Sequence, residues 1–134
     1  RGAPDAQMQM NSQQDIRIEV AVRYLTEQSD PDADRYAFAY TVEICNRGME
    51  AVKLLNRYWH ITDDNEKVDE VRGEGVIGQQ PEILPGQSFH YTSGAVIETK
   101  FGSMHGDYEM QSSSGEKFTA KIPPFLLAPP LAVH

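Results

Sequence analysis

The sequence predicts an all-β protein, an antiparallel β-sandwich of about seven to eight short strands. Apolar residues alternate with polar or small residues at a period of two, which is typical of half-buried strands. Turn signals recur at a spacing of roughly 8–12 residues. No stretch of about ten residues without Gly or Pro repeats apolar side chains at helical spacing. These observations favour a sandwich over an α/β fold.

The first half of the chain alternates apolar strands with polar turns. The predicted strands cover residues 16–24, 36–45, 52–54 and 58–61. Pro31, within the polar segment 29–34, predicts a turn between the first two strands. Asn46-Arg47-Gly48 predicts the next turn, and residues 63–67 predict a hairpin loop.

The second half is richer in glycine and proline. Residues 68–71 form a returning strand, and residues 73–87 are expected to be irregular. A strand over 88–93 is expected to end at Gly94, and residues 102–106 to form a turn. Further predicted strands cover residues 108–112 and 118–122, with a hairpin turn over 114–117 between them.

Length and composition indicate one domain with polar ends. The chain has 134 residues and a mass of 15.0 kDa, enough to bury a core without disulfides or structural metal. We expect a flexible N-terminal tail over residues 1–14, the β-sandwich domain over 15–128 and a C-terminal tail over 129–134.

The charge balance excludes two classes of partner. The formal net charge is −8, which repels nucleic-acid polymers and anionic membranes.

Cys45 is the single cysteine, so the chain can form no internal disulfide or multi-cysteine zinc site. A lone thiol suits a reducing compartment, so the sequence predicts a cytoplasmic protein. No apolar run approaches the length needed to span a bilayer.

A proline–glycine corner refines the fold prediction. Ile83-Leu84-Pro85-Gly86 precedes a strand that carries Phe89 and Tyr91. Immunoglobulin-like and fibronectin type III-like sandwiches use such corners, where an inward tyrosine bonds the backbone through its hydroxyl. Phe89 or Tyr91 is expected to fill the aromatic place at the corner, and only Tyr91 has a hydroxyl that could bond the backbone.

Five long segments resemble the ApaG domain family, in order along the chain. They are residues 57–63 (RYWHITD), 70–81 (EVRGEGVIGQQP), 85–94 (PGQSFHYTSG), 102–110 (GSMHGDYEM) and 122–125 (IPPF). The resemblance covers residues 16–127 approximately. One departure is Glu66, because members of the family often have Gly at that hairpin position.

The resemblance implies a fibronectin type III-like fold and a binding role. Family members occur as free-standing bacterial proteins, named from a gene beside a diadenosine tetraphosphate hydrolase. They also occur as substrate-binding domains of some eukaryotic F-box proteins. Bacterial members are associated with cobalt resistance and magnesium efflux, and the family has no settled enzymatic activity.

Residues 73–78 spell the motif G-x-G-x-x-G. In dinucleotide-binding folds this motif connects a strand to a helix whose N-terminus meets a pyrophosphate. The following residues contain Pro81 and Pro85 and predict no helix. The favoured interpretation is an inter-strand loop. A reduced hypothesis is an anion nest of backbone N–H groups, with Arg72, Gly73, Gly75 and Gly78 as tentative ligand-binding residues. On that hypothesis Gly75→Ala would weaken phosphate binding and leave the fold intact.

Other chemistry-bearing residues carry less weight. His105 and Asp107 share one face of an extended segment and could contact cobalt, although two ligands make a weak site. The acidic residues 63–66 lack the register of a calcium loop. Cys45 adjoins Ile44 in an apolar strand, where thiols are usually inert. Trp59 is expected in the core. We predict no catalytic residue, no metal site and no cofactor.

The leading hypothesis is a non-enzymatic binding module that mediates protein–protein interaction with a partner not yet identified. The alternative is phosphate or nucleotide binding of the diadenosine polyphosphate type, with a nucleotide or pyrophosphate held by the loop Gly73–Gly78. A third hypothesis is a response to cobalt or magnesium.

Overall fold

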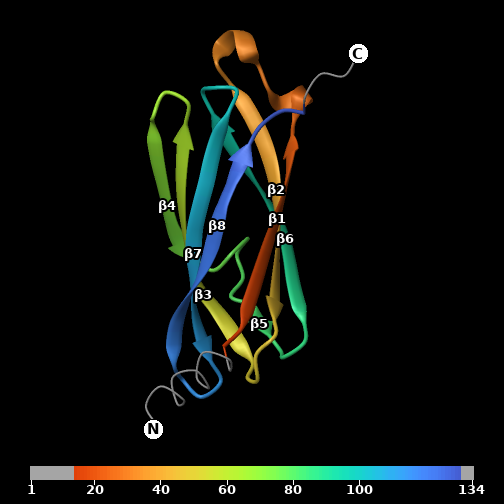
Figure 1. Ribbon diagram of the computed structural model, residues 1–134, viewed down its shortest axis with the longest axis vertical. Helices are drawn as coiled ribbons and strands as arrows, with labels where there is room; N and C mark the ends of the chain where they lie inside the picture. Colours follow the sequence, from red (N-terminus) through yellow and green to blue (C-terminus); the bar gives the residue numbers. More distant parts are fainter. Residues whose placement is uncertain (1–13, 131–134) are drawn as a thin grey trace, which may run out of the picture.

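Two antiparallel sheets pack face to face in the computed structural model, which describes residues 14–130 (Figure 1). The described residues form eight strands: β1 (Ile16–Tyr24), β2 (Tyr36–Asn46), β3 (Val52–Asp63), β4 (Val68–Glu74), β5 (Glu82–Ile83), β6 (Ser88–Ile97), β7 (Gly102–Ser112) and β8 (Lys117–Leu127). Two short 3-10 turns, η1 (Thr26–Gln28) and η2 (Pro31–Ala33), join β1 to β2. The predicted antiparallel β-sandwich is confirmed.

The smaller sheet has the strand order β1-β2-β6. The side chains of β1 alternate between half-buried and exposed along its whole length, as a period of two requires when one face meets the core. The larger sheet has the order β4-β3-β7-β8, and β5 adds to β3. Among residues 14–130, strand β4 therefore has no neighbour on its outer side and forms a free edge, and it lies apart from the smaller sheet in Figure 1.

The core fills the space between the sheets. Trp59 is 2% exposed and packs edge-on against the rings of Tyr40, Tyr108 and Phe125, so its expected place in the core is confirmed. The largest fully buried side chains also include Phe38, Ile44, Leu54, Met104, Met110, Ile122 and Leu127. Such interlocking aromatic and branched side chains fix the two sheets relative to one another.

A bulge reverses the face on which β3 side chains lie. The register with β7 shifts between Leu54 and Asn56, so Leu55 is an extra residue. Beyond it, Arg57 and Trp59 share the inner face, while Tyr58 lies on the outer face. The predicted third and fourth apolar segments are thus one bulged strand.

The structure corrects two expected breaks. Gly94 does not end a strand, because β6 continues through it to Ile97 and pairs Gly94 with Ala39. Residues 102–106 form no turn but begin β7, opposite Asp63 to Trp59 of β3. Gly102 and Gly106 lie inside a strand where the backbone of β3 approaches closely, a role of glycine that differs from a turn. Pro123 and Pro124 likewise lie within β8, on the outer edge of the larger sheet.

The predicted domain limits, residues 15 and 128, enclose every strand, from Ile16 to Leu127. The predicted N-terminal tail lies outside the described residues except for Gln14, whose side chain donates a hydrogen bond to Glu116 at 2.6 Å. Of the C-terminal tail, only 129 and 130 are described. Within residues 14–130, no helix has the length and apolar character to cross a membrane.

Candidate functional site

Strand β4 projects from the sandwich as the outer half of a hairpin. The Asp63 carboxylate holds the turn, because its Oδ1 accepts hydrogen bonds from the N–H groups of Asn65 and Lys67 at 2.8 and 2.9 Å. Six of the seven residues of β4 are exposed, and Gly73 is half-buried. The strand therefore presents both faces and one edge to solvent.

The free edge of β4 carries main-chain groups without a strand partner. The Lys67 carbonyl and the Gly75 N–H both point toward β3. Main-chain groups alternate in direction along an antiparallel strand. The N–H and C=O groups of residues 69, 71 and 73 therefore also point toward β3. The N–H and C=O groups of Val68, Glu70 and Arg72 consequently point away from the sheet.

The outer face beside this edge is acidic; we call the side chains of Asn56, Tyr58, Glu70, Arg72, Asp107 and Glu109 the acidic face. Tyr58 donates a hydrogen bond to Glu70 at 2.5 Å, and the Arg72 guanidinium lies 4.5 Å from the centre of the Tyr58 ring. The hydrogen bond lowers the pKa of Glu70 and raises that of Tyr58. Glu70 is thus held ionised.

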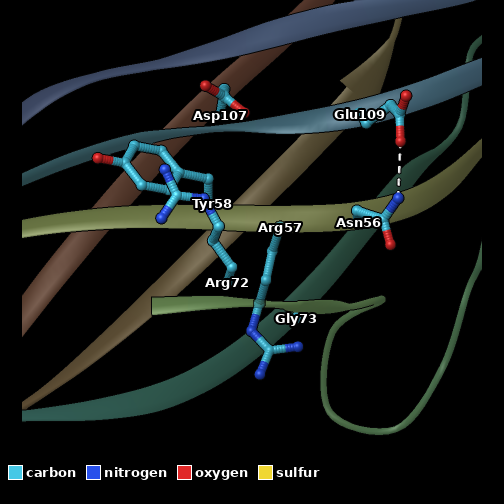
Figure 2. A pocket seen from close by; sticks show the side chains of 7 residues that line it. All are labelled: Asn56, Arg57, Tyr58, Arg72, Gly73, Asp107 and Glu109. Carbon is cyan, nitrogen blue, oxygen red and sulfur yellow. Dashed lines mark hydrogen bonds between the residues drawn. The ribbon is translucent and has the colours of Figure 1, made fainter. Parts of the chain in front are cut away.

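The acidic face contains a shallow hollow of about 440 Å³. Figure 2 shows Asn56 donating to Glu109 along one wall, at 2.6 Å, and Asp107 opposite Tyr58. Three carboxylates, those of Glu70, Asp107 and Glu109, share this region with two guanidiniums: Arg72 lies beside Glu70, and Arg57 lines the hollow but directs its guanidinium past Gly73. The local charge therefore favours a basic ligand over an anionic one.

Two histidines extend this outer face. His60 of β3 and His105 of β7 are direct cross-strand neighbours whose rings stack with centroids 4.6 Å apart. Asp107 lies on the same face as His105, as the sequence predicts. Within residues 14–130, no three His, Cys, Asp or Glu side chains are grouped closely enough to hold a metal ion. The two imidazoles alone would make an incomplete site.

The glycine motif folds into a tight turn after β4. Val76 and Gln79 exchange two backbone hydrogen bonds, of 2.8 and 2.9 Å, around Ile77 and Gly78. Both central residues have positive φ, 42° at Ile77 and 76° at Gly78, which is the pattern of a type I′ turn. Between the motif and residue 130 the chain forms strands β5 to β8 and no helix.

The loop uses several of its N–H groups internally. Gly75 donates to Leu55, and Val76 and Gln79 donate to each other. Arg72 extends over Tyr58 on the outer face, whereas the open side of Gly73 faces inward against Arg57. The four tentative ligand residues are therefore neighbours in sequence. However, the Arg72 side chain lies on one face of the sheet, and the guanidinium that contacts Gly73, that of Arg57, lies on the other.

The expectation that Gly75→Ala leaves the fold intact is wrong on steric grounds. Gly75 has a φ of 64°, and an added Cβ would overlap the carbonyl oxygen of Gln79. A substitution there must displace the turn. Gly78 has open space around its Cα, so only its backbone conformation favours glycine.

Arg57 is a candidate residue that sequence reasoning missed. Its guanidinium points away from the acidic face, past Gly73 (Figure 2), and its Nη1 donates to the carbonyl oxygens of Glu74 and Gly75 at 3.2 and 3.0 Å. A Cβ on Gly73 would lie 2.7 Å from the guanidinium carbon. The first glycine of the motif thus gives room to an arginine instead of a phosphate. The bulge at Leu55, which turns Arg57 inward, has no signal in the sequence.

Buried tyrosines accompany Arg57 inside the sandwich. The hydroxyls of Tyr91 and Tyr108 share a hydrogen bond of 2.5 Å, so Tyr91 bonds another side chain rather than the backbone expected at the proline–glycine corner. Burial raises the pKa of Tyr91 to about 12 and raises that of Tyr108 further. The nearby positive charge of Arg57 opposes both shifts.

Cys45 lies on the outer face of the smaller sheet, not in apolar packing. It is half-buried beside the charged residues Arg17, Glu19, Glu43 and Arg47. The neighbouring Ile44 points into the core, and adjacent strand residues face opposite ways.

The geometry defines a class of protein: a β-sandwich with an exposed edge strand and a shallow hollow beside it, both on the larger sheet. The model of the ApaG domain matches residues 26–112 of the chain. Protein ApaG from Pseudomonas putida strain W619 is 54% identical over 119 residues, covering 89% of this chain and 94% of that protein. Protein ApaG from Stenotrophomonas maltophilia strain K279a is 50% identical over the same length.

Solved structures agree with this assignment. A crystal structure of a putative ApaA protein from Bordetella pertussis has a TM-score of 0.86 and 46% identity, covering 89% of this chain and 97% of that chain. An X-ray structure of a structural genomics target has a TM-score of 0.84 and 49% identity, covering 92% of each chain. The chain belongs to the ApaG domain family.

Proposed function

We propose that the chain is a non-enzymatic binding module that recognises an extended, basic segment of a partner protein along β4. The observation that carries this proposal is the free edge of β4, with the main-chain groups of Val68, Glu70 and Arg72 directed outward. Proteins commonly bind extended peptides by adding a strand to such an edge. Left uncovered, a seven-residue edge is a liability for aggregation.

The side chains around the edge support a partner of basic character. A strand added beside β4 would place alternate side chains on the acidic face and the others beside Val71 on the inner side. Basic residues at the first set of positions would meet Glu70, Asp107 and Glu109. Apolar residues at the second set would cover Val71, which is 38% exposed.

A designed peptide pair tests this proposal. An acetylated peptide of alternating Lys and Val presents one basic and one apolar face when extended, and an alternating Glu and Val peptide is its charge-reversed control. We expect saturable binding of the Lys-Val peptide to the full chain, weakened by salt, and no binding of the Glu-Val peptide. Equal binding of both peptides would contradict the charge argument.

A proline substitution separates edge pairing from side-chain contact. Arg72→Pro removes the outward N–H of Arg72 but none of the β3–β4 hydrogen bonds, whereas Arg72→Thr removes the guanidinium and keeps the N–H. We expect Arg72→Pro to bind the Lys-Val peptide about tenfold more weakly than Arg72→Thr, because one main-chain hydrogen bond is lost. Equal affinities in two folded variants would exclude strand addition at β4.

The nucleotide alternative places diadenosine polyphosphate on Arg72 and the loop Gly73–Gly78. The geometry favours it less, since Gly75, Val76 and Gln79 donate their N–H groups internally and Glu70 lies beside Arg72. A titration with diadenosine tetraphosphate, with and without magnesium, tests it directly. Saturable amide shifts confined to residues 72–80 would establish this alternative in place of the peptide site.

A further inference from the structure

A second, smaller hollow of about 200 Å³ lies between the two sheets, under the turn formed by Val76 to Gln79. The rings of Tyr40, Trp59 and Tyr91 line it, together with Arg57, Ile77 and Ser93. Small-molecule sites commonly combine an aromatic lining with a few convergent polar groups. We call this space the inner hollow. Its aromatic side chain from β3, Trp59, lies on the opposite face of that strand from the acidic face, and Arg57 lines both hollows.

Arg57 is held in place from one side only. Its Nη1 is fixed by the carbonyl oxygens of Glu74 and Gly75, and its plane lies against Gly73. Within residues 14–130 the guanidinium makes no other hydrogen bond and no ion pair with a carboxylate. The edge formed by Nε and Nη2 is therefore available, and such an edge matches the two oxygens of a carboxylate.

Further donors lie beside this guanidinium. Tyr40 and Ser93 are direct cross-strand partners of β2 and β6, and both line the inner hollow with Arg57. Burial raises the pKa of Tyr40, while the neighbouring Ser93 hydroxyl and the charge of Arg57 oppose the rise. An oxyanion at the Nε–Nη2 edge would meet one guanidinium and two hydroxyls, which are the groups that orient such a ligand.

The rim of the inner hollow contains backbone strain. Ile77 is a β-branched residue with a φ of 42°, and its side chain is 54% exposed. Asn or Gly is the usual residue at this turn position, because L side chains clash in the left-handed region. Strained backbone of this kind gathers at ligand clamps. Ile77 thus lines the inner hollow from a strained turn position.

We propose that the inner hollow binds a small monocarboxylic acid with an aromatic or branched apolar body. The carboxylate pairs with Arg57, and the body lies against the rings of Tyr40 and Trp59 beneath Ile77. A cavity of about 150 Å³ holds one benzene molecule, so the inner hollow has room for a single ring and a carboxylate. A doubly charged phosphate is less suited to a chain with a net charge of −8.

Tryptophan fluorescence provides the test, because Trp59 is the only tryptophan and it lines the hollow. Phenylacetate is the probe, titrated into the full chain, and phenylacetamide is its neutral control. We expect a saturable change in Trp59 fluorescence with phenylacetate and none with phenylacetamide. The absence of a saturable change with phenylacetate, or equal binding of the amide, would overturn the proposal.

Variants locate the site. Arg57→Gln should weaken phenylacetate binding at least about tenfold, as expected for loss of a charge-assisted bidentate pair, and Tyr40→Phe should weaken it several-fold. Arg72→Thr, on the opposite face, should leave it unchanged. Should Arg57→Gln fail to fold, Tyr40→Phe and Ile77→Asn decide the question. Unchanged affinity in those folded variants would refute the site.

Inorganic phosphate distinguishes the ligand classes. We expect it to compete with phenylacetate only weakly. Phosphate that displaces phenylacetate and binds Arg57 more tightly would overturn the monocarboxylate assignment. This site does not depend on peptide binding at β4, since Arg72→Pro, which disables the edge, is expected to retain phenylacetate binding.

Discussion

At the scale of single residues, the turns contain non-glycine residues in the left-handed region. Glu66 in the β3–β4 hairpin has a φ of 64°, at the position where the sequence departs from the pattern expected of the family. A side chain in that region costs roughly 1–2 kcal/mol. The sequence departure at Glu66 therefore has a local physical cost, and it does not alter the hairpin.

Glu66→Gly should stabilise the protein. We expect the free energy of unfolding to rise by about 0.5–1 kcal/mol, because relief of the left-handed strain exceeds the added entropy of the unfolded chain. Urea denaturation measures the change. Asn65→Gly, at a neighbouring position without positive φ, is the control and should not stabilise. A loss of stability in Glu66→Gly would show that the Glu66 side chain contributes more than its backbone costs.

Ile77→Asn should separate stability from binding. Asparagine tolerates the left-handed conformation, so we expect the free energy of unfolding to rise by about 1 kcal/mol. The same change uncovers the inner hollow and should weaken phenylacetate binding. Denaturation and fluorescence titration of one variant measure both effects. A variant that is less stable than the parent would contradict the assignment of strain to Ile77.

At the scale of elements, the pairing of β3 with β7 depends on Gly106. A Cβ at this position would overlap the carbonyl oxygen of Tyr58 and lie 3.2 Å from the Cα of Trp59. Gly106 sits at the register shift between β7 and β8, where the backbones of three strands approach closely. Gly94 in β6 meets nothing closer than 3.4 Å.

Alanine at Gly106 should destabilise the protein strongly, whereas alanine at Gly94 should change its stability little. Gly106→Ala should lower the free energy of unfolding by at least about 2 kcal/mol, because β3 and β7 must separate. Gly94→Ala should change it by less than about 1 kcal/mol, with alanine favoured in a strand interior. Thermal unfolding of the pair measures the contrast. Similar destabilisation by both would contradict the close approach at Gly106.

The sequence patterns predicted which strands exist better than the residues at which each strand begins and ends. Period-two alternation identified β1 and β2 well because each has one face on the core. Glycine was misleading in β6 and β7, since Gly94 and Gly106 lie inside strands. Gly and Pro give the same local signal whether they permit a turn or a close approach between strands, and only the partner strand distinguishes the two.

At the scale of the whole molecule, three phenols stand inside the sandwich: those of Tyr40, Tyr91 and Tyr108. Burial raises the pKa of each above the ordinary value. The unfolded chain therefore loses these protons at a lower pH than the folded chain does. Their contribution to stability is complete below about pH 10 and is lost as the pH rises toward 12.

The protein should thus unfold in alkali through its core. We expect the free energy of unfolding to fall steadily above about pH 10, as measured by urea denaturation at a series of pH values. Tyr91→Phe removes one of the three phenols and should make that fall shallower. A free energy of unfolding that stays constant above pH 10 would contradict the buried state of these phenols.

The candidate sites show where sequence reasoning ended. It selected Arg72 and the glycines of the loop, and it predicted that His105 and Asp107 share a face. It could not select Arg57, because a one-residue bulge at Leu55 decides which way that side chain points. Nor could it predict that Tyr40 and Ser93 lie near Arg57, since the two hydroxyl residues belong to the smaller sheet and Arg57 to the larger one. Register and sheet packing, which are set by long-range pairing, assemble both sites.

Amide hydrogen exchange at β4 tests the central claim most directly. The N–H groups of Val68, Glu70 and Arg72 point to solvent in the free chain and should exchange fast. Saturation with the Lys-Val peptide should slow the exchange of these three amides, while the amides of 69, 71 and 73, which are already paired with β3, should change little. Slowed exchange confined to other strands, or no slowing in the saturated complex, would contradict the proposal that β4 is the recognition edge.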